Sequence, residues 1–300
     1  MASPQFSPEF LTKAFPGLAG FRYMAAGSYK SVYHVTRADG SSDEVLKVVR
    51  LPITRKTEEE EALYQQELGR VQRETAILGK CTSPFVVKMG KLLPQTIEVD
   101  NCPCFAYTEE LLSGNDLSSV INFNANKPAD ESEVKRLLRC LVSAVQTLWR
   151  DHRVVHRDIK PANVFATRDP ARPYVLIDLG IAYDVSVPGL TLRKTDIPHT
   201  PLYMAPEMLS ADFRETMSYR SDLYAAGLCA YEYAAGVHPL AKQGDDLRRT
   251  YTRVIHQEPT PLQQLRPDLS PDFCQLIDQL LKKSPSLRPA NMNLILNQIA

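Results

Sequence analysis

The segment Val154–Phe165, with the sequence VVHRDIKPANVF, carries polar side chains at a spacing that suits chemistry on phosphate. They are Asp158, Lys160 and Asn163. A carboxylate on a loop can accept or orient the proton of a hydroxyl, and a nearby lysine can reach a phosphate oxygen. The amide oxygen of Asn163 can bind a hard cation. The alternative for Asp158 is an aspartate that caps a turn.

A second carboxylate follows in the stretch VLIDLG. Asp178 ends this apolar strand and precedes Gly180. The order loop, strand, turn, strand should bring Asn163 and Asp178 close together. Two protein oxygens plus phosphate oxygens suit Mg²⁺, which keeps most of its water. The residues therefore predict phosphoryl transfer, in which positioning and charge neutralisation dominate. Without the motif, Asp178 would be a turn residue at a strand end.

The composition is that of a globular protein of about two domains or lobes. Of 300 residues, 44% are hydrophobic, which is enough for a substantial core. Lys plus Arg and Asp plus Glu both total 35, so the net charge gives no indication of nucleic-acid binding. Six scattered cysteines predict buried free thiols in a reducing compartment, and the N-terminus lacks a signal peptide. No apolar run approaches the about 18 residues of a membrane span. We expect a cytoplasmic protein.

The first part of the chain predicts a small sheet with one helix. Residues 1–20 form either a loose arm or an early packing segment. Two strands should meet at a turn at Asp39-Gly40, and further strands are predicted at 85–93 and 104–112. A charged helix is predicted at 57–78, because its first turn is acidic and three apolar residues recur near helical spacing. These residues are Leu63, Val71 and Leu78.

From about Asp116 the pattern is that of helices. Asp130 and Glu133 predict a capping pair. They precede a helix with one broad apolar face: Val134, Leu137, Leu138, Leu141, Val142, Val145, Leu148 and Trp149. A second buried helix is expected before Gly236, and a third in the segment 270–283.

With these residues in place, a family resemblance is clear. HRDIKPAN resembles the catalytic loop of eukaryotic-type (Hanks-type) serine/threonine protein kinases, and DLG resembles their DFG motif. Further matches follow the family order over about residues 21–300: VLKVV, RETAIL, HTPLYMAPE, RSDLYAAG and SLRPAN. The resemblance implies an α+β, bilobal protein-kinase-like fold. It has a small antiparallel β-sheet N-lobe with one main helix (about 21–110), a hinge (about 110–116) and a mostly helical C-lobe (about 117–300).

The resemblance also implies roles for individual residues. Asp158, Lys160, Asn163 and Asp178 would be catalytic, with Asn163 and Asp178 holding Mg²⁺. Lys47 would contact ATP and pair with Glu74, although an isolated lysine in VLKVV could also face solvent.

Other matches imply supporting roles. Asp222 would brace the backbone of the catalytic loop, and Arg288 would pair with Glu207. His156 should pack below the loop as a structural residue. Leu179 replaces the phenylalanine of DFG and can fill the same apolar position.

The nucleotide-binding loop departs most from the family pattern G-x-G-x-x-G-x-V. The stretch from Ala25 to Val32 keeps only the middle glycine, Gly27. We expect Ala25, Gly27 and Ser28 at the ATP phosphates. The resemblance places Val32, Val45 and Phe165 around the adenine and the hinge backbone near Glu110 to Gly114 on its edge.

Specificity and regulation are also implied. Lys160-Pro161 together with Thr200 is the pattern of Ser/Thr kinases, and the region after residue 236 resembles bacterial ones. Arg157 before the catalytic aspartate suggests control by phosphorylation in the following loop. The candidate sites are Ser186, Thr191 and Thr195. The alternative is a structural arginine with no phosphate partner.

We therefore expect an ATP- and Mg²⁺-dependent serine/threonine protein kinase that acts on protein substrates and autophosphorylates. Partners would be proteins and not nucleic acids, and a dimer could carry out the autophosphorylation in trans. One alternative is a pseudokinase that serves as a nucleotide-binding scaffold, which the degraded glycine loop favours. Another is a small-molecule phosphotransferase, which the APE segment opposes.

Overall fold

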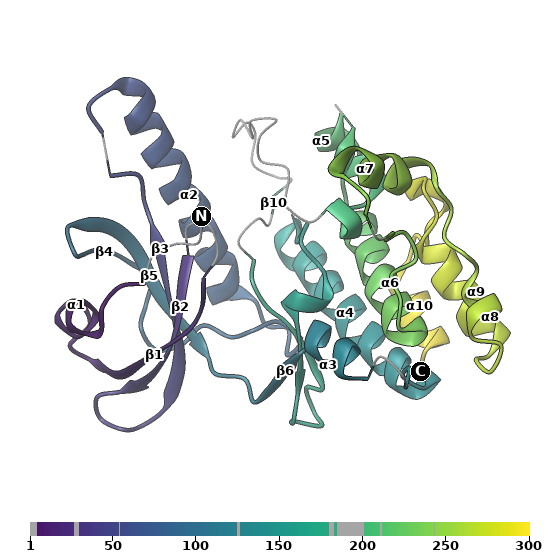
Figure 1. Ribbon diagram of the computed structural model, residues 1–300, viewed down its shortest axis with the longest axis horizontal. Coiled ribbons are helices and arrows are strands. Elements are labelled where there is room, and N and C mark those ends of the chain that lie inside the picture. The colour runs from purple at the N-terminus through teal and green to yellow at the C-terminus, as the bar shows by residue number, and fades with distance from the viewer. Residues whose placement is uncertain are drawn as a thin grey trace. The chain divides into compact units, whose positions relative to one another are not determined.

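The computed structural model describes residues 5–26, 30–53, 55–124, 127–179, 183–184, 201–210, 212–242 and 244–300 (Figure 1). The chain divides into two compact units. The N-terminal unit comprises Met1–Cys81 and Val87–Leu112, and the C-terminal unit comprises Thr82–Val86 and Ser113–Ala300. The division after Leu112 falls inside the segment predicted as a hinge.

A five-stranded antiparallel sheet, of order β1-β2-β3-β5-β4, is the base of the N-terminal unit. The strands are β1 Leu18–Ala26, β2 Lys30–Arg37, β3 Asp43–Arg50, β4 Gln95–Val99 and β5 Cys102–Glu110. The predicted turn at Asp39-Gly40 joins β2 to β3, and Gly40 has the positive φ of 69° that glycine adopts readily. The predicted strand at 85–93 is wrong. Val86 bridges Leu176 and Met89 bridges Glu109, so the segment forms isolated bridges to two different strands and no continuous ladder.

The predicted charged helix is α2, Glu58–Lys80. Thr57 caps it: its hydroxyl accepts from the Glu60 amide, and the Glu60 carboxylate accepts from the Thr57 amide. Val71 and Leu78 are buried as predicted, but Leu63 is 39% exposed. Tyr64 is buried instead, because a spacing of seven residues places it on the same helix face as Val71 and Leu78.

The segment before the sheet forms α1, Pro8–Ala14, which packs against β1 and β4. Of the two interpretations of residues 1–20, the described residues support the packing segment. Phe6, Leu11 and Phe15 join a buried cluster on one face of the sheet. The strand residues of this cluster include Tyr33, Val35, Leu46, Val48, Cys104 and Ala106. The opposite face of β2, β3 and β5 carries Val32, Lys47 and Tyr107, because successive side chains alternate between faces.

The C-terminal unit is mostly helical. Its α-helices are α3 Leu117–Phe123, α4 Glu131–His152, α5 Phe213–Thr216, α6 Tyr219–Ala235, α7 Leu247–His256, α8 Leu262–Leu265, α9 Pro271–Leu280 and α10 Met292–Gln298. The 3₁₀ helices are η1 Pro161–Asn163, η2 Pro201–Tyr203, η3 Pro206–Leu209 and η4 Pro285–Leu287. The strands β6 Gly114–Asp116, β8 Val164–Thr167 and β9 Tyr174–Leu176 form one sheet, and β7 Val154–Val155 pairs with β10 Tyr183–Asp184.

Three predicted helices form the core of this unit. Asp130 caps α4 by accepting from the Glu133 amide at 3.0 Å, and the predicted apolar positions are buried except Trp149, which is half-buried. Helix α4 packs against α6, and α6 packs against α9 (Figure 1). Gly227 permits the second contact, because a Cβ there would lie 2.9 Å from the Cβ of Leu280.

All six cysteines are buried and free, as predicted. Burial raises the pKa of Cys140 and of Cys274 to about 11, so both thiols stay protonated near neutral pH. Among the described residues, no helix combines the length and the hydropathy needed to cross a membrane.

Candidate active site

The segment between β7 and β8 gathers the three polar side chains that the sequence singled out. Lys160 Nζ donates to both carboxylate oxygens of Asp158, each at 2.9 Å. Asn163 Nδ2 donates to Asp158 Oδ2 at 2.7 Å and to the Asp158 carbonyl at 2.9 Å. The Asp158 and Lys160 side chains are 20% and 21% exposed, so solvent and a substrate can reach them. The short turn of η1 brings Asn163 back to Asp158.

Asp178 reaches the same end of the β8–β9 pair as Asn163. Val164 pairs with Leu176, and the Ile177 amide donates to the Asn163 carbonyl at 2.9 Å. Asp178 has a positive φ of 65°, which aspartate tolerates better than most residues. The Asn163 side chain bonds to Asp158 through Nδ2. Within the described residues, its Oδ1 makes no hydrogen bond. The backbone thus brings an amide oxygen and a carboxylate to one place, and both are ligand types that Mg²⁺ accepts.

Asp222 fixes the start of the loop that carries Asp158. Its carboxylate accepts from the His156 amide at 2.7 Å and from the Arg157 amide at 3.0 Å. Burial raises the pKa of Asp222 to about 7, and the two amide bonds act in the opposite direction. The predicted bracing role is confirmed. It also explains how Arg157 is held at a positive φ of 71°.

His156 lies under the loop with 0% of its surface exposed. Its Nδ1 accepts from the Asp158 amide at 3.3 Å, so it fixes the backbone at Asp158. Burial lowers the pKa of His156 to about 4, which keeps the imidazole neutral near physiological pH. The prediction of a structural histidine is confirmed.

Glu207 and Arg288 form the expected buried pair. Arg288 Nη1 and Nη2 donate to the two oxygens of Glu207 at 2.7 and 2.8 Å. Ser221 Oγ, at the start of α6, donates to the same carboxylate at 2.6 Å. These hydrogen bonds link η3 to the start of α6 and to the segment after η4.

In the N-terminal unit, sheet register defines a row of residues on the face opposite α1. Residues paired directly across antiparallel strands share a face. The row runs Ala25, Val32, Lys47 and Tyr107, and the next rung holds Val45 and Glu109. Val32 and Val45 are half-buried, and Ala25 is exposed. The face thus combines apolar side chains with the polar groups of Lys47, Tyr107 and Glu109.

The expected ion pair between Lys47 and Glu74 is not formed among the described residues. Lys47 Nζ instead lies 2.6 Å from Glu109 Oε1, and Glu74 Oε1 accepts from the Tyr107 hydroxyl at 2.8 Å. Both partners of the observed pair are held by adjacent strands, whereas Glu74 sits on the separate helix α2. Glu109 and Tyr107 were not among the residues predicted from the sequence. The sequence signal that could have found them is a pair of polar side chains two residues apart on a strand otherwise rich in apolar residues.

The structure describes some of the remaining predicted residues and not others. Phe165 is half-buried on β8, and Leu179 is buried with 3% of its surface exposed. Gly114 begins β6, where a Cβ would lie 2.0 Å from the Ala166 carbonyl oxygen, so only glycine fits. The following predicted residues lie outside the described part of the chain: Gly27, Ser28, Ser186, Thr191, Thr195 and Thr200.

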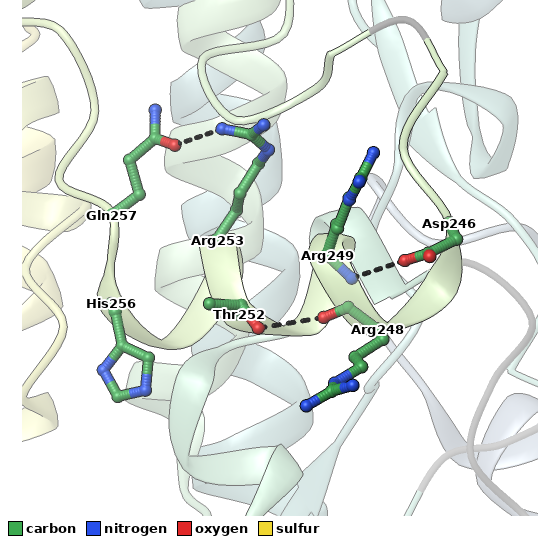
Figure 2. Close-up of a pocket in the computed structure, with 7 residues that line it drawn as sticks. All are labelled: Asp246, Arg248, Arg249, Thr252, Arg253, His256 and Gln257. Atoms are coloured by element: carbon green, nitrogen blue, oxygen red, sulfur yellow. Dashed lines mark hydrogen bonds between the residues drawn. The ribbon is translucent and has the colours of Figure 1, made fainter.

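A surface concavity on α7 is separate from these residues. Figure 2 shows its lining: Asp246, Arg248, Arg249, Thr252, Arg253, His256 and Gln257. Arg253 donates to Gln257 at 2.7 Å and also pairs with Asp245. None of the described residues predicted for catalysis or nucleotide binding lines this concavity.

Comparison with known proteins agrees with this geometry. The sequence model of the protein kinase domain matches residues 21–298. The chain is 32% identical over 227 residues to the serine/threonine-protein kinase PkaA of Streptomyces coelicolor, covering 75% of this chain and 38% of PkaA. It is 30% identical over 163 residues to the dual specificity mitogen-activated protein kinase kinase mek-1 of Caenorhabditis elegans, covering 54% of this chain and 44% of mek-1. The chain thus spans less than half the length of these relatives.

A solved structure shares the fold. The kinase domain of PknI from Mycobacterium tuberculosis superposes with a TM-score of 0.64 at 21% identity, covering 94% of this chain and 95% of that one. The predicted protein kinase fold is confirmed, with an antiparallel N-terminal sheet and a mostly helical C-terminal unit. Together with the match over residues 21–298, this makes the chain a member of the protein kinase domain family.

Proposed function

We propose that this chain is a protein kinase that transfers the γ-phosphate of ATP to serine and threonine hydroxyls of proteins. The cluster of Asp158, Lys160 and Asn163 carries the proposal, because its polar atoms lie within hydrogen-bond distance of one carboxylate. Asp158 would orient the substrate hydroxyl and accept its proton. Lys160 would neutralise negative charge on the phosphoryl group during transfer.

Mg²⁺ is the metal that the donor set fits. Asn163 Oδ1 and the Asp178 carboxylate are hard oxygen ligands, and Mg²⁺ typically takes few protein ligands beside water and phosphate. When bound, the ion would neutralise phosphate charge. The N-terminal unit would contribute the Lys47 ammonium to the phosphates, with Val32 and Val45 as apolar contacts for the base.

The test is transfer of labelled phosphate from ATP, with Mg²⁺, to a library of peptides containing serine, threonine or tyrosine. Wild type should label serine and threonine peptides, and Asp158→Asn should reduce the rate at least about 100-fold, because the base is lost. Circular dichroism of the variant should match wild type. Labelling of tyrosine peptides would instead extend the activity toward dual specificity, the term in the name of mek-1.

A nucleotide-binding scaffold without catalysis is the second candidate. Ala25 at the first glycine position and the engagement of Lys47 by Glu109 favour it. ATP binding with no phosphate transfer in wild type would support the scaffold. We also propose autophosphorylation, which mass spectrometry of active protein would detect at Ser186, Thr191 or Thr195. A dimer that acts in trans and a cytoplasmic location stay predictions.

A further inference from the structure

The polar face of the N-terminal sheet places one ammonium beside two carboxylates. Lys47 on β3 pairs directly with Tyr107 on β5, and Glu109 follows Tyr107 on the same face. Glu74 approaches from α2 through the Tyr107 hydroxyl. Lys47 Nζ also lies 5.8 Å from the centre of the Tyr107 ring.

The hydrogen bonds divide the two carboxylates between two donors. Glu109 receives the Lys47 ammonium at 2.6 Å, and Glu74 receives the Tyr107 hydroxyl at 2.8 Å. A tyrosine has a single proton to donate, and Tyr107 donates it to Glu74, whereas the Lys47 ammonium contacts Glu109. The four side chains thus form two separate contacts.

Both members of the Lys47–Glu109 pair are buried, which makes their contact important for stability. The side chains of Lys47 and Glu109 are 7% and 5% exposed, so the two opposite charges compensate each other in a buried setting. Burial raises the pKa of Glu109, and the Glu74 charge acts in the same direction, while Lys47 and Lys30 oppose both. Contact with the Lys47 ammonium favours the charged form of Glu109 and so acts against the effect of burial.

We propose that Glu109 is the positioning residue for Lys47, and that Glu74 is held by Tyr107 as a separate anchor of α2. An ammonium carries three donors, so Lys47 can keep Glu109 and still donate to a phosphate oxygen. Glu109 fixes Lys47 on the face where the nucleotide would lie. The role toward nucleotide rests on the proposed function, whereas the pairing itself does not.

The pairing is tested by two double-mutant cycles measured by urea unfolding without nucleotide. One cycle combines Lys47→Met with Glu109→Gln, and the other combines Lys47→Met with Glu74→Gln. The first double variant should lose less stability than the sum of its single variants, because it removes both buried charges together. The second cycle should be close to additive. A larger coupling between Lys47 and Glu74 would overturn the proposal.

The positioning role is tested by binding of a fluorescent ATP analogue and by KM for ATP. Glu109→Gln should weaken binding about 10-fold, equal to about 1.4 kcal/mol, with KM rising more than kcat falls. Glu109→Asp should recover part of the affinity, since it keeps the carboxylate. Glu98→Gln, on the exposed surface of β4, is the matched control and should bind like wild type.

The outcomes distinguish the Lys47–Glu109 pairing from the role of Glu109 in nucleotide binding. If Glu74→Gln weakens binding more than Glu109→Gln does, Glu109 is not the positioning residue. If wild type fails to bind any nucleotide, the proposed function falls, and the unfolding cycles still decide whether Lys47 is coupled to Glu109 or to Glu74.

Discussion

Loss of the Arg288 guanidinium should destabilise the C-terminal unit severely. The side chain is 0% exposed and forms two charge-assisted bonds to Glu207, which is itself 6% exposed. It also donates to the carbonyls of Arg220, Lys282 and Lys283. Arg288→Met leaves the Glu207 carboxylate buried without a counter-charge. Removing one partner of a buried pair costs about 3–5 kcal/mol, a large share of the roughly 5–15 kcal/mol that stabilises a typical protein.

The single tryptophan provides the assay. Trp149 lies on α4, and its ring centre is 5.4 Å from that of Tyr219 on α6, so its fluorescence reports unfolding of this unit. Arg288→Met should shift the midpoint of urea unfolding strongly to lower urea concentration. Adding Glu207→Gln should recover part of the loss, because this pair then leaves no buried charge without a partner. Arg248→Met, at an exposed position on α7, is the control and should change stability by less than about 0.5 kcal/mol. A loss in Arg288→Met no larger than in this control would refute the reasoning.

Three further predictions concern other parts of the fold. Leu11→Ala in α1 should cost about 2–5 kcal/mol, because Leu11 is fully buried, and faster hydrogen exchange in β1 and β4 would show it. Gly227→Ala should cost about 1–3 kcal/mol by overpacking α6 against Leu280, measured as a lower melting temperature. His156 has its pKa lowered from 6.5 to about 4, so the folded state binds fewer protons and stability falls as pH drops below 6.5. The 2.5-unit shift corresponds to roughly 3 kcal/mol lost by pH 4, and His156→Asn should flatten that pH dependence in urea titrations.

The cluster around Asp158 could be predicted from sequence because its members are near neighbours in the chain. Asp158, Lys160 and Asn163 lie on one loop, so local geometry alone brings them together. The turn at Asp39-Gly40 and the helix end at Gly236 were predictable for the same reason, since each depends on a local backbone conformation.

What the sequence missed depends on contacts between distant segments. The contact of Lys47 with Glu109 depends on the register of β3 against β5, which is not visible in a local motif. Leu63 and Tyr64 differ by one helical position, and the prediction names Leu63 although the seven-residue spacing to Val71 and Leu78 places Tyr64 on the buried face. The segment 85–93 has the composition of a strand but bridges two different strands.

The central claim is tested most directly by phosphate transfer from labelled ATP, with Mg²⁺, in wild type and in Asp158→Asn. Both proteins should bind the fluorescent ATP analogue, and only wild type should transfer phosphate to serine and threonine peptides at a substantial rate. Transfer that continues at the wild-type rate in Asp158→Asn would contradict the account, because the carboxylate that gathers Lys160 and Asn163 would then have no part in the reaction.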